Sequence, residues 1–150
     1  LHKAIRRQRQ MCIRDSIYGA LNTTKVVIDG MCDAGWGRIV QVSSGSARTG
    51  QDIGVSMYAA GKSGVEGFVR HLAAEVGKFG VTANILALGH QANLADVMAP
   101  EQVAGLLRMI PIRRLGDPME VGAAVAYLAS DESGGLTGQT IDFNGGSQTR

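Results

Sequence analysis

The sequence predicts an α/β fold in which helices cover both faces of a parallel β-sheet. Short runs of β-branched and apolar residues alternate with longer stretches whose apolar residues recur every three or four positions. The connections between these runs are long enough for crossovers, which favours parallel strands. The length of 150 residues suits one domain with a sizeable core, and a composition of 45% apolar and 19% charged residues is typical of a globular protein.

The first half of the chain contains two predicted helices with a strand between them. Apolar residues with a helical period at 17–32 predict an amphipathic helix that ends near Ala-Gly at 34–35. The β-branched run G-R-I-V-Q-V-S-S at 37–44 predicts a buried strand. A loop rich in Gly and Ser follows at 45–56. A long apolar stripe at 57–78 then predicts the second helix.

The second half of the chain continues the alternation. V-T-A-N-I-L-A-L at 81–88 predicts a strand, and residues 89–99 a mobile loop. A short helix is expected from Pro100. The Asp-Pro pair at 117–118 favours another helix start, because aspartate caps a helix and proline suits its first position. Residues 137–146 complete the pattern with a last strand and a glycine turn.

Composition and cysteine content limit the compartments and partners that we expect for this protein. No apolar stretch approaches the length of a membrane span, so we expect a soluble protein with no membrane partner. Cys12 and Cys32 have no metal-ligand spacing, so no metal site is expected. Two lone cysteines fit a reducing compartment, which favours a cytoplasmic location.

The net charge of +2 is unevenly distributed. Residues 1–15 hold five basic residues against one acidic residue, and the rest of the chain is mildly acidic. This opening run is either a nucleic-acid-binding arm or a flexible or non-native leader. We favour the leader because the run has no clear periodicity and no helix caps, and we expect no nucleic-acid partner. Residues 16–150 then form the folded part.

Tyr58 and Lys62 are the residues with the clearest chemical pattern. They lie four positions apart in a predicted helix, so both side chains share one helical face. A free phenol has a pKa of about 10, and a neighbouring ammonium favours its phenolate form. Ser44 ends the predicted strand at 37–44, where ligands bind in open parallel sheets. A serine, a tyrosine and a lysine make an acid/base set for reducing a ketone or oxidising an alcohol, with hydride supplied by a cofactor.

Structural roles are the alternative for each of these residues. Taken alone, Tyr58 could be a half-buried helix tyrosine and Lys62 a solvated charge, and Ser43 or Ser44 could simply end a strand. A serine hydrolase is disfavoured because the sequence has no G-x-S-x-G elbow. His90 could line a substrate pocket, but an ordinary loop histidine is the favoured interpretation.

Six sequence blocks, in order, carry a resemblance to a known family. They are G-R-I-V-Q-V-S-S, Y-A-A-G-K-S-G-V-E-G-F, G-V-T-A-N-I-L-A-L-G, R-R-L-G-D-P-M-E-V, Y-L-A-S-D and T-G-Q-T-I-D-F-N-G-G. Together they resemble the classical short-chain dehydrogenase/reductases, and most closely the 3-oxoacyl-carrier-protein reductase-like branch. The resemblance covers 16–147 and corresponds to the C-terminal part of the family's catalytic domain.

The resemblance implies a fold and a set of roles. The fold would be the C-terminal portion of a Rossmann-like doubly wound parallel sheet with flanking helices. Ser44 would be the catalytic serine and Tyr58 the acid/base. Lys62 would tune Tyr58 and hold the nicotinamide ribose of NAD or NADP. The other cofactor-binding candidates, at the nicotinamide end, are Gly89, the Gln91 backbone and the Asn93 side chain. The substrate would be a carbonyl or alcohol compound, with a 3-oxoacyl thioester as one candidate, and the parent enzyme a homo-oligomer, a dimer or a tetramer.

The sequence also departs from the family pattern. It has no T-G-x-x-x-G-x-G stretch, which grips the cofactor pyrophosphate, and no later N-A-G segment, so the N-terminal dinucleotide-binding half is expected to be missing. Ser16 replaces the usual asparagine at the head of the first helix. Leu88 replaces the usual proline before Gly89, and Asn93 a usual threonine. The alternative to an oxidoreductase is therefore an inactive remnant that serves as a subunit-interaction module through the helices at 17–32 and 57–78.

Overall fold

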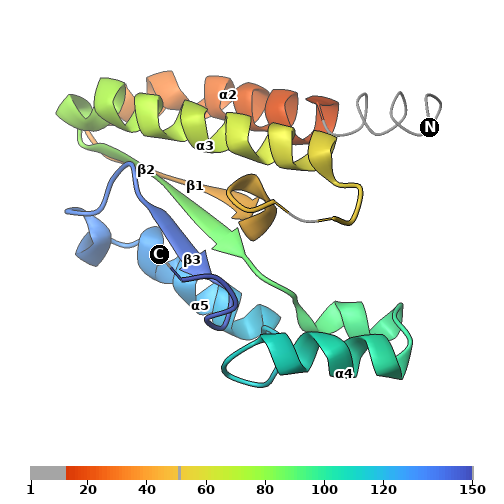
Figure 1. Cartoon of the computed structure of the whole chain (residues 1–150). Helices are drawn as coiled ribbons and strands as arrows, with labels where there is room; N and C mark the ends of the chain where they lie inside the picture. The colour runs from red at the N-terminus through yellow and green to blue at the C-terminus, as the bar shows by residue number, and fades with distance from the viewer. Residues whose placement is uncertain (1–12, 51, 150) are drawn as a thin grey trace.

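A computed structural model describes residues 13–50 and 52–149 of the chain (Figure 1). Helices and strands alternate along it, as expected. The helices are η1 (Ile13–Tyr18, a π-helix), α2 (Gly19–Ala34), α3 (Ser56–Val76), α4 (Pro100–Met109) and α5 (Pro118–Leu128), and the strands are β1 (Gly37–Ser44), β2 (Val81–Leu88) and β3 (Thr140–Phe143). Short 3₁₀ turns join them at Gly45–Ala47 (η2), Gly77–Phe79 (η3), Ala92–Asp96 (η4) and Asp131–Ser133 (η5). Most of the predicted leader at 1–15 lies outside the described residues.

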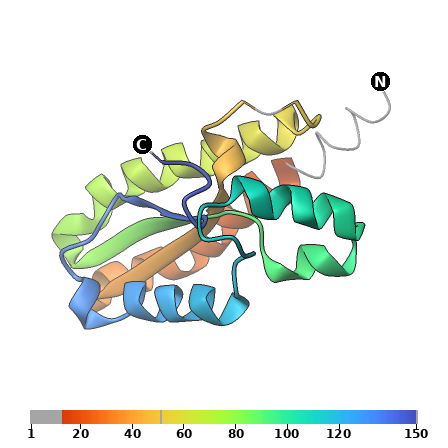
Figure 2. The ribbon, with the colours of Figure 1, turned by 60° about the horizontal axis from the view of Figure 1, so that its bottom comes forward.

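The three strands form a parallel sheet in the order β1-β2-β3. Ser44 pairs with Leu88, and Leu88 pairs with Phe143, so the carboxyl ends of all three strands meet at one edge of the sheet. Helices α2 and α3 cover one face, and α5 lies on the other (Figures 1 and 2). The predicted parallel sheet with helices on both faces is confirmed. Helix α4 lies beyond the carboxyl edge, after the segment that leaves β2.

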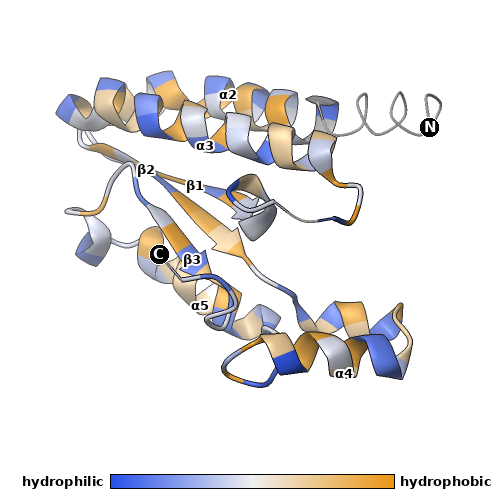
Figure 3. Cartoon of the chain, in the orientation of Figure 1, coloured by the Kyte–Doolittle hydropathy of each residue, from blue (hydrophilic) through white to orange (hydrophobic). Residues whose placement is uncertain are grey.

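The core lies between α3 and the sheet. Val69 of α3 and Ala83 and Ile85 of β2 have no exposed surface, and they pack with Val65, Leu72, Val76 and Val81. Strand β2 is apolar along most of its length, as Figure 3 shows, because both of its faces are covered. The carboxyl end of this buried central strand therefore lies directly on the core.

Helix α5 begins where the sequence predicted. The Oδ1 atom of Asp117 accepts a hydrogen bond from the Met119 amide over 2.9 Å, and Pro118 occupies the first turn. Helix α2 ends at Gly35, which has a φ of 68°, as a left-handed glycine cap. Local capping rules therefore predicted both of these ends correctly.

Three details differ from the sequence predictions. Strand β1 is less buried than expected, because Val42 is 43% exposed. The loops at 45–56 and 89–99 contain the turns η2 and η4. The first helix begins with a π-helical turn, a hydrogen-bond pattern that apolar periodicity does not distinguish from an α-helix. No helix among the described residues is long and apolar enough to cross a membrane.

Candidate active site

Ser44 ends β1 at the carboxyl edge of the sheet. Its backbone is extended, with φ of −143° and ψ of 152°, and its Oγ accepts a hydrogen bond from the Ser46 amide over 3.3 Å. This contact caps the turn η2. Because a hydroxyl can donate one hydrogen bond while it accepts others, Ser44 keeps the capacity to donate to a bound carbonyl oxygen.

Tyr58 and Lys62 occupy the first two turns of α3. The Lys62 Nζ lies over the Tyr58 ring, 5.8 Å from its centroid, and donates a hydrogen bond to the Val42 carbonyl oxygen over 2.9 Å. Val42 precedes Ser44 by two residues on β1. The lysine therefore ties the start of α3, where Tyr58 lies, to the strand that ends with Ser44.

Burial changes the acid/base properties of Lys62. Its surroundings remove water from the ammonium, and this desolvation lowers the pKa of Lys62 below its ordinary value of 10.5. The hydrogen bond to Val42 holds the amine in place despite that cost. A lysine oriented in this way beside a phenol can stabilise the phenolate through its charge.

Gly89 and Gln91 form a second part of the site, after β2. The Gly89 amide donates to Phe143 O over 3.0 Å, and a Cβ at Gly89 would lie 2.8 Å from the Asn144 Cα, so only glycine fits here. The Gln91 Nε2 donates to Gly89 O over 3.2 Å. Asn93 is exposed on η4, away from the buried side of this segment.

The residues after β2 fit the carboxamide end of a nicotinamide ring. A carboxamide needs both a donor and an acceptor from the protein. The Gln91 Oε1 is buried and has no hydrogen-bond partner within the described part of the chain. The space that a Cβ at Gly89 would take is filled by Asn144 of this chain, so glycine is needed here for the close packing of the turn after β3. The Gln91 side chain therefore offers an unused acceptor for the carboxamide at this end of NAD or NADP.

The C-terminal turn also borders the site, which the sequence analysis missed. A cavity of about 110 Å³ lies beside Ser44, and its lining includes Gly89 and His90 together with Asn144, Ser147 and Gln148 from this turn. The Gln148 Nε2 donates to Thr49 Oγ1 over 3.1 Å, which fastens the turn to the loop after β1. Applying the strand-end rule to 140–143 as well would have found it.

His90 lines this small cavity and also a larger one of about 610 Å³. The larger cavity lies between the segment after β2, the start of α5 and the turn after β3; its lining includes Gln91, Arg114, Gly116, Glu120 and Asn144. The pocket-lining interpretation of His90, which the sequence analysis disfavoured, therefore agrees with its position. Tyr58 and Lys62 line neither cavity.

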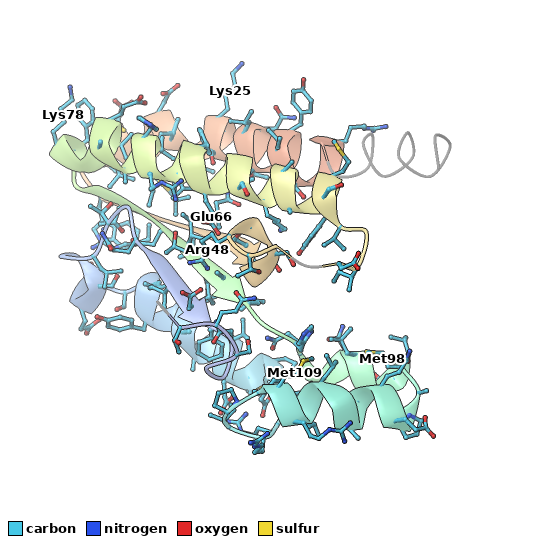
Figure 4. The ribbon with its side chains drawn as sticks, viewed as in Figure 1. Lys25, Arg48, Glu66, Lys78, Met98 and Met109 are labelled. Atoms are coloured by element: carbon cyan, nitrogen blue, oxygen red, sulfur yellow. The ribbon has the colours of Figure 1, made fainter. Side chains whose placement is uncertain are left out.

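A buried acidic residue lies behind the catalytic candidates. The Glu66 side chain is 2% exposed, and its Oε1 accepts a hydrogen bond from Ser43 Oγ over 2.7 Å. Arg48 lies beside it in Figure 4 and pairs with both Glu66 and Asp142. Glu66 is four residues after Lys62, a spacing that could have placed it on the same face of α3. Within the described residues, no group of His, Cys, Asp and Glu could hold a metal ion.

Comparison with known proteins adds to this geometry. A family model described as enoyl-(acyl carrier protein) reductase matches residues 2–148. The chain is 40% identical to the acetoacetyl-CoA reductase of Cupriavidus necator over 135 residues, which cover 89% of this chain and 54% of that protein.

Solved structures are similar as well. A 3-oxoacyl-[acyl-carrier protein] reductase of Brucella melitensis with bound NAD has a TM-score of 0.81 and 38% identity, and the match covers 89% of this chain and 49% of that one. A gluconate 5-dehydrogenase of Burkholderia cenocepacia in complex with NADP and tartrate has a TM-score of 0.84 and 28% identity, covering 90% and 54%. The chain thus spans about half the length of these relatives. It belongs to the short-chain dehydrogenase/reductase family and is similar to its 3-oxoacyl-carrier-protein reductases.

Proposed function

We propose that this chain provides the acid/base half of an NAD(P)-dependent oxidoreductase. The enzyme would transfer hydride between a nicotinamide cofactor and a carbonyl or alcohol substrate. The observation that carries this proposal is the position of Lys62, over the Tyr58 ring and bonded to β1 two residues before Ser44. This arrangement supports the proposal that a donor, a proton-transfer group and a cation act together at the edge where ligands bind in parallel sheets.

Each of the three residues has a distinct role in the proposed reaction. The Ser44 hydroxyl donates a hydrogen bond to the substrate carbonyl oxygen and polarises it. The Tyr58 hydroxyl gives its proton to that oxygen as the carbonyl carbon is reduced, so a C=O group becomes CH–OH. The Lys62 ammonium stabilises the phenolate that remains. Alcohol oxidation runs through the same groups in reverse, with Tyr58 accepting the proton.

The cofactor would be held at its nicotinamide end. When bound, it supplies the hydride that the side chains of a protein cannot supply. Lys62 and Tyr58 would contact the ribose hydroxyls. Gly89, Gln91 and Asn93 would contact the carboxamide. The cofactor is NAD or NADP, and the residues proposed here contact its nicotinamide end, whereas the two cofactors differ at the adenosine ribose.

The favoured substrate class is a short 3-oxoacyl thioester. The relatives named acetoacetyl-CoA reductase and 3-oxoacyl-[acyl-carrier-protein] reductase support this choice. We further propose a homo-oligomeric enzyme, a dimer or a tetramer, in the cytoplasm. The assignment of residues 1–15 as a flexible or non-native leader, and of 16–150 as the C-terminal part of the catalytic domain, stays a prediction.

An inactive remnant that binds other subunits is the second candidate. Its support is the apolar surface of the outer helical layer, where Val26 of α2 is 84% exposed and Tyr18 is 55% exposed. Such side chains could pack against a second copy of α2 and α3. Cofactor binding by the chain separates this candidate from an active fragment.

A titration of the 150-residue chain with NADPH and NADH tests the fragment itself. The only tryptophan, Trp36, serves as the donor for fluorescence energy transfer to the reduced nicotinamide. Saturable transfer that Lys62→Met weakens, and Lys25→Met does not, would support an active fragment. The absence of saturable transfer would favour the subunit-interaction module for this chain.

A chimaera tests the enzymatic assignment apart from the fragment. The 135 matched residues of the C. necator acetoacetyl-CoA reductase are exchanged for the corresponding residues of this chain. We expect the chimaera to oxidise NADPH or NADH in the presence of acetoacetyl-CoA. A folded chimaera that binds the nucleotide but transfers no hydride to any carbonyl substrate would contradict the proposed function.

A further inference from the structure

The carboxylate of Glu66 joins three parts of the molecule around Ser44. Its Oε1 accepts from Ser43 Oγ over 2.7 Å and lies 3.4 Å from Arg48 Nε. Ser43 directly precedes Ser44, and Arg48 follows it by four residues. One oxygen atom on α3 therefore contacts both ends of the short segment that contains the proposed catalytic serine.

Arg48 extends this network to the far strand of the sheet. Its Nη1 donates to Asp142 Oδ2 over 3.3 Å, and its Nη2 also pairs with the Asp142 carboxylate. The Arg48 side chain is only 15% exposed. Arg48 thus bridges α3 and β3 from a position in the turn η2 region, as its place between these elements in Figure 4 indicates.

The burial of Glu66 makes these contacts obligatory. A carboxylate with 2% exposure is strongly disfavoured unless cations and hydrogen-bond donors surround it. Arg70 also approaches Glu66, at 3.8 Å, but its side chain is 54% exposed and lies on the same helix. Loss of Arg48 would therefore leave the buried Glu66 carboxylate without its less exposed cationic partner. It would also free the segment at 45–48 to move.

The Ser44 side chain takes part in the hydrogen bonding of the segment at 44–48. The Ser46 amide donates to Ser44 Oγ over 3.3 Å, and the Arg48 amide donates to Gly45 O over 3.0 Å. Both bonds lie inside the segment that Glu66 holds at its two ends. If the segment loosens, the hydroxyl of Ser44 loses its fixed direction.

We propose that Glu66 and Arg48 are positioning residues for Ser44. Glu66 holds Ser43 and Arg48, Arg48 also holds Asp142, and together they fix the turn η2 so that the Ser44 hydroxyl faces the substrate side of the sheet edge. This inference rests on the proposed role of Ser44 in carbonyl reduction. A buried charge on α3 thereby fixes the orientation of the serine hydroxyl at the end of β1.

Amide hydrogen exchange in the 150-residue chain tests the positioning effect without requiring activity. Glu66→Gln keeps the shape and a hydrogen-bond acceptor for Ser43, and Arg48→Gln removes the bridge. We expect exchange of the Ser46 amide to quicken by about tenfold in each variant, while the amide of the core residue Val69 keeps its rate. Arg70→Gln is the control and should leave Ser46 exchange within about twofold of the wild type.

The double variant Arg48→Gln/Glu66→Gln separates a shared network from two unrelated effects. Residues that act through one another give a double variant no worse than the more severe single variant. Multiplied effects on Ser46 exchange would overturn the proposal, as would wild-type exchange in both single variants. If either single variant does not fold, Arg48→Lys decides, because it keeps a cation beside the buried Glu66 carboxylate but cannot pair with both Glu66 and Asp142 through one guanidinium group. Wild-type exchange of the Ser46 amide in Arg48→Lys would overturn the proposal.

The chimaera gives the catalytic readout. There, Arg48→Gln should lower kcat by about tenfold with little change in KM for the nucleotide, because the serine acts on the reacting oxygen. A rise in KM with unchanged kcat would overturn the positioning role. Failure of the unsubstituted chimaera to transfer hydride would instead contradict the proposed function, and the two failures are thereby distinguished.

Discussion

Lys62 combines a charge with partial burial, and this combination gives the folded protein a pH dependence. Desolvation disfavours the ammonium and lowers the pKa of Lys62 below 10.5 in the folded state. Between this lowered pKa and 10.5, the unfolded chain binds more protons at this residue than the folded chain does. Stability contributed by this group therefore rises with pH across that window, and the desolvation cost is present in full below it.

Replacement of Lys62 by methionine should remove this contribution. As the pH rises toward 10.5, the unfolding free energy of the wild type should increase relative to that of Lys62→Met. Urea unfolding at a series of pH values measures the difference. Lys25→Met, at an exposed position on α2, is the control for the titration of other groups. A difference between wild type and Lys62→Met that stays constant with pH would contradict a lowered pKa of Lys62 in the folded state.

Individual site residues differed in how well the sequence predicted them. The four-residue spacing of Tyr58 and Lys62 is a local feature, so their proximity could be anticipated. The position of Ser44 at the end of β1 could be anticipated for the same reason. The contacts of Glu66 with Ser43 and Arg48 could not, because they join residues 18 to 23 positions apart through a buried charge. Burial of a glutamate in a helix has no clear mark in a single sequence.

At the scale of the elements, two glycine turns meet at the amino ends of the strands. Gly80 has a φ of 74°, and a Cβ there would lie 2.2 Å from the carbonyl oxygen of Gly35. Both the backbone conformation and the lack of space require glycine. This contact lets the turns before β1 and β2 lie close together, and it thus supports the parallel pairing that begins at Gly37 and Val81.

Gly80→Ala should destabilise the fold by about 2–4 kcal/mol, from the strained φ and the displaced Gly35 carbonyl. Gly77→Ala is the matched control three residues earlier. Gly77 has a helical φ of −56° and nothing within 4 Å of an added Cβ, so alanine there should be neutral or stabilise by about 0.5–1 kcal/mol. Urea unfolding of the wild type and both variants measures the change in unfolding free energy. Equal stabilities would show that the close approach at Gly80 is unimportant.

Most of the elements could be predicted because their rules are local. Apolar periodicity located α2 and α3, an Asp-Pro cap located α5, and a β-branched run located β1. The prediction that the whole of β1 is buried was wrong at Val42. The exposure of a strand residue depends on which elements cover the strand, and a short sequence run does not show which elements these are. The same limit explains why the C-terminal turn was missed as part of the site.

At the scale of the whole molecule, the chain holds one side of a proposed active site. It spans about half the length of its relatives, and it includes the serine, tyrosine and lysine together with the segment after β2. The sequence has no glycine-rich stretch for the pyrophosphate of the cofactor. We therefore expect the chemistry to appear when the chain is joined to a dinucleotide-binding half, as in the chimaera.

The central claim is that Tyr58 transfers the proton, and Tyr58→Phe in the chimaera tests it most directly. The variant removes one hydroxyl, so the rate of hydride transfer to acetoacetyl-CoA should fall by about 10²–10⁴-fold while the unfolding free energy changes by less than about 1 kcal/mol. Tyr127→Phe, at a half-exposed position on α5, is the control and should keep the wild-type rate. Near-normal turnover in a folded Tyr58→Phe chimaera would contradict the account.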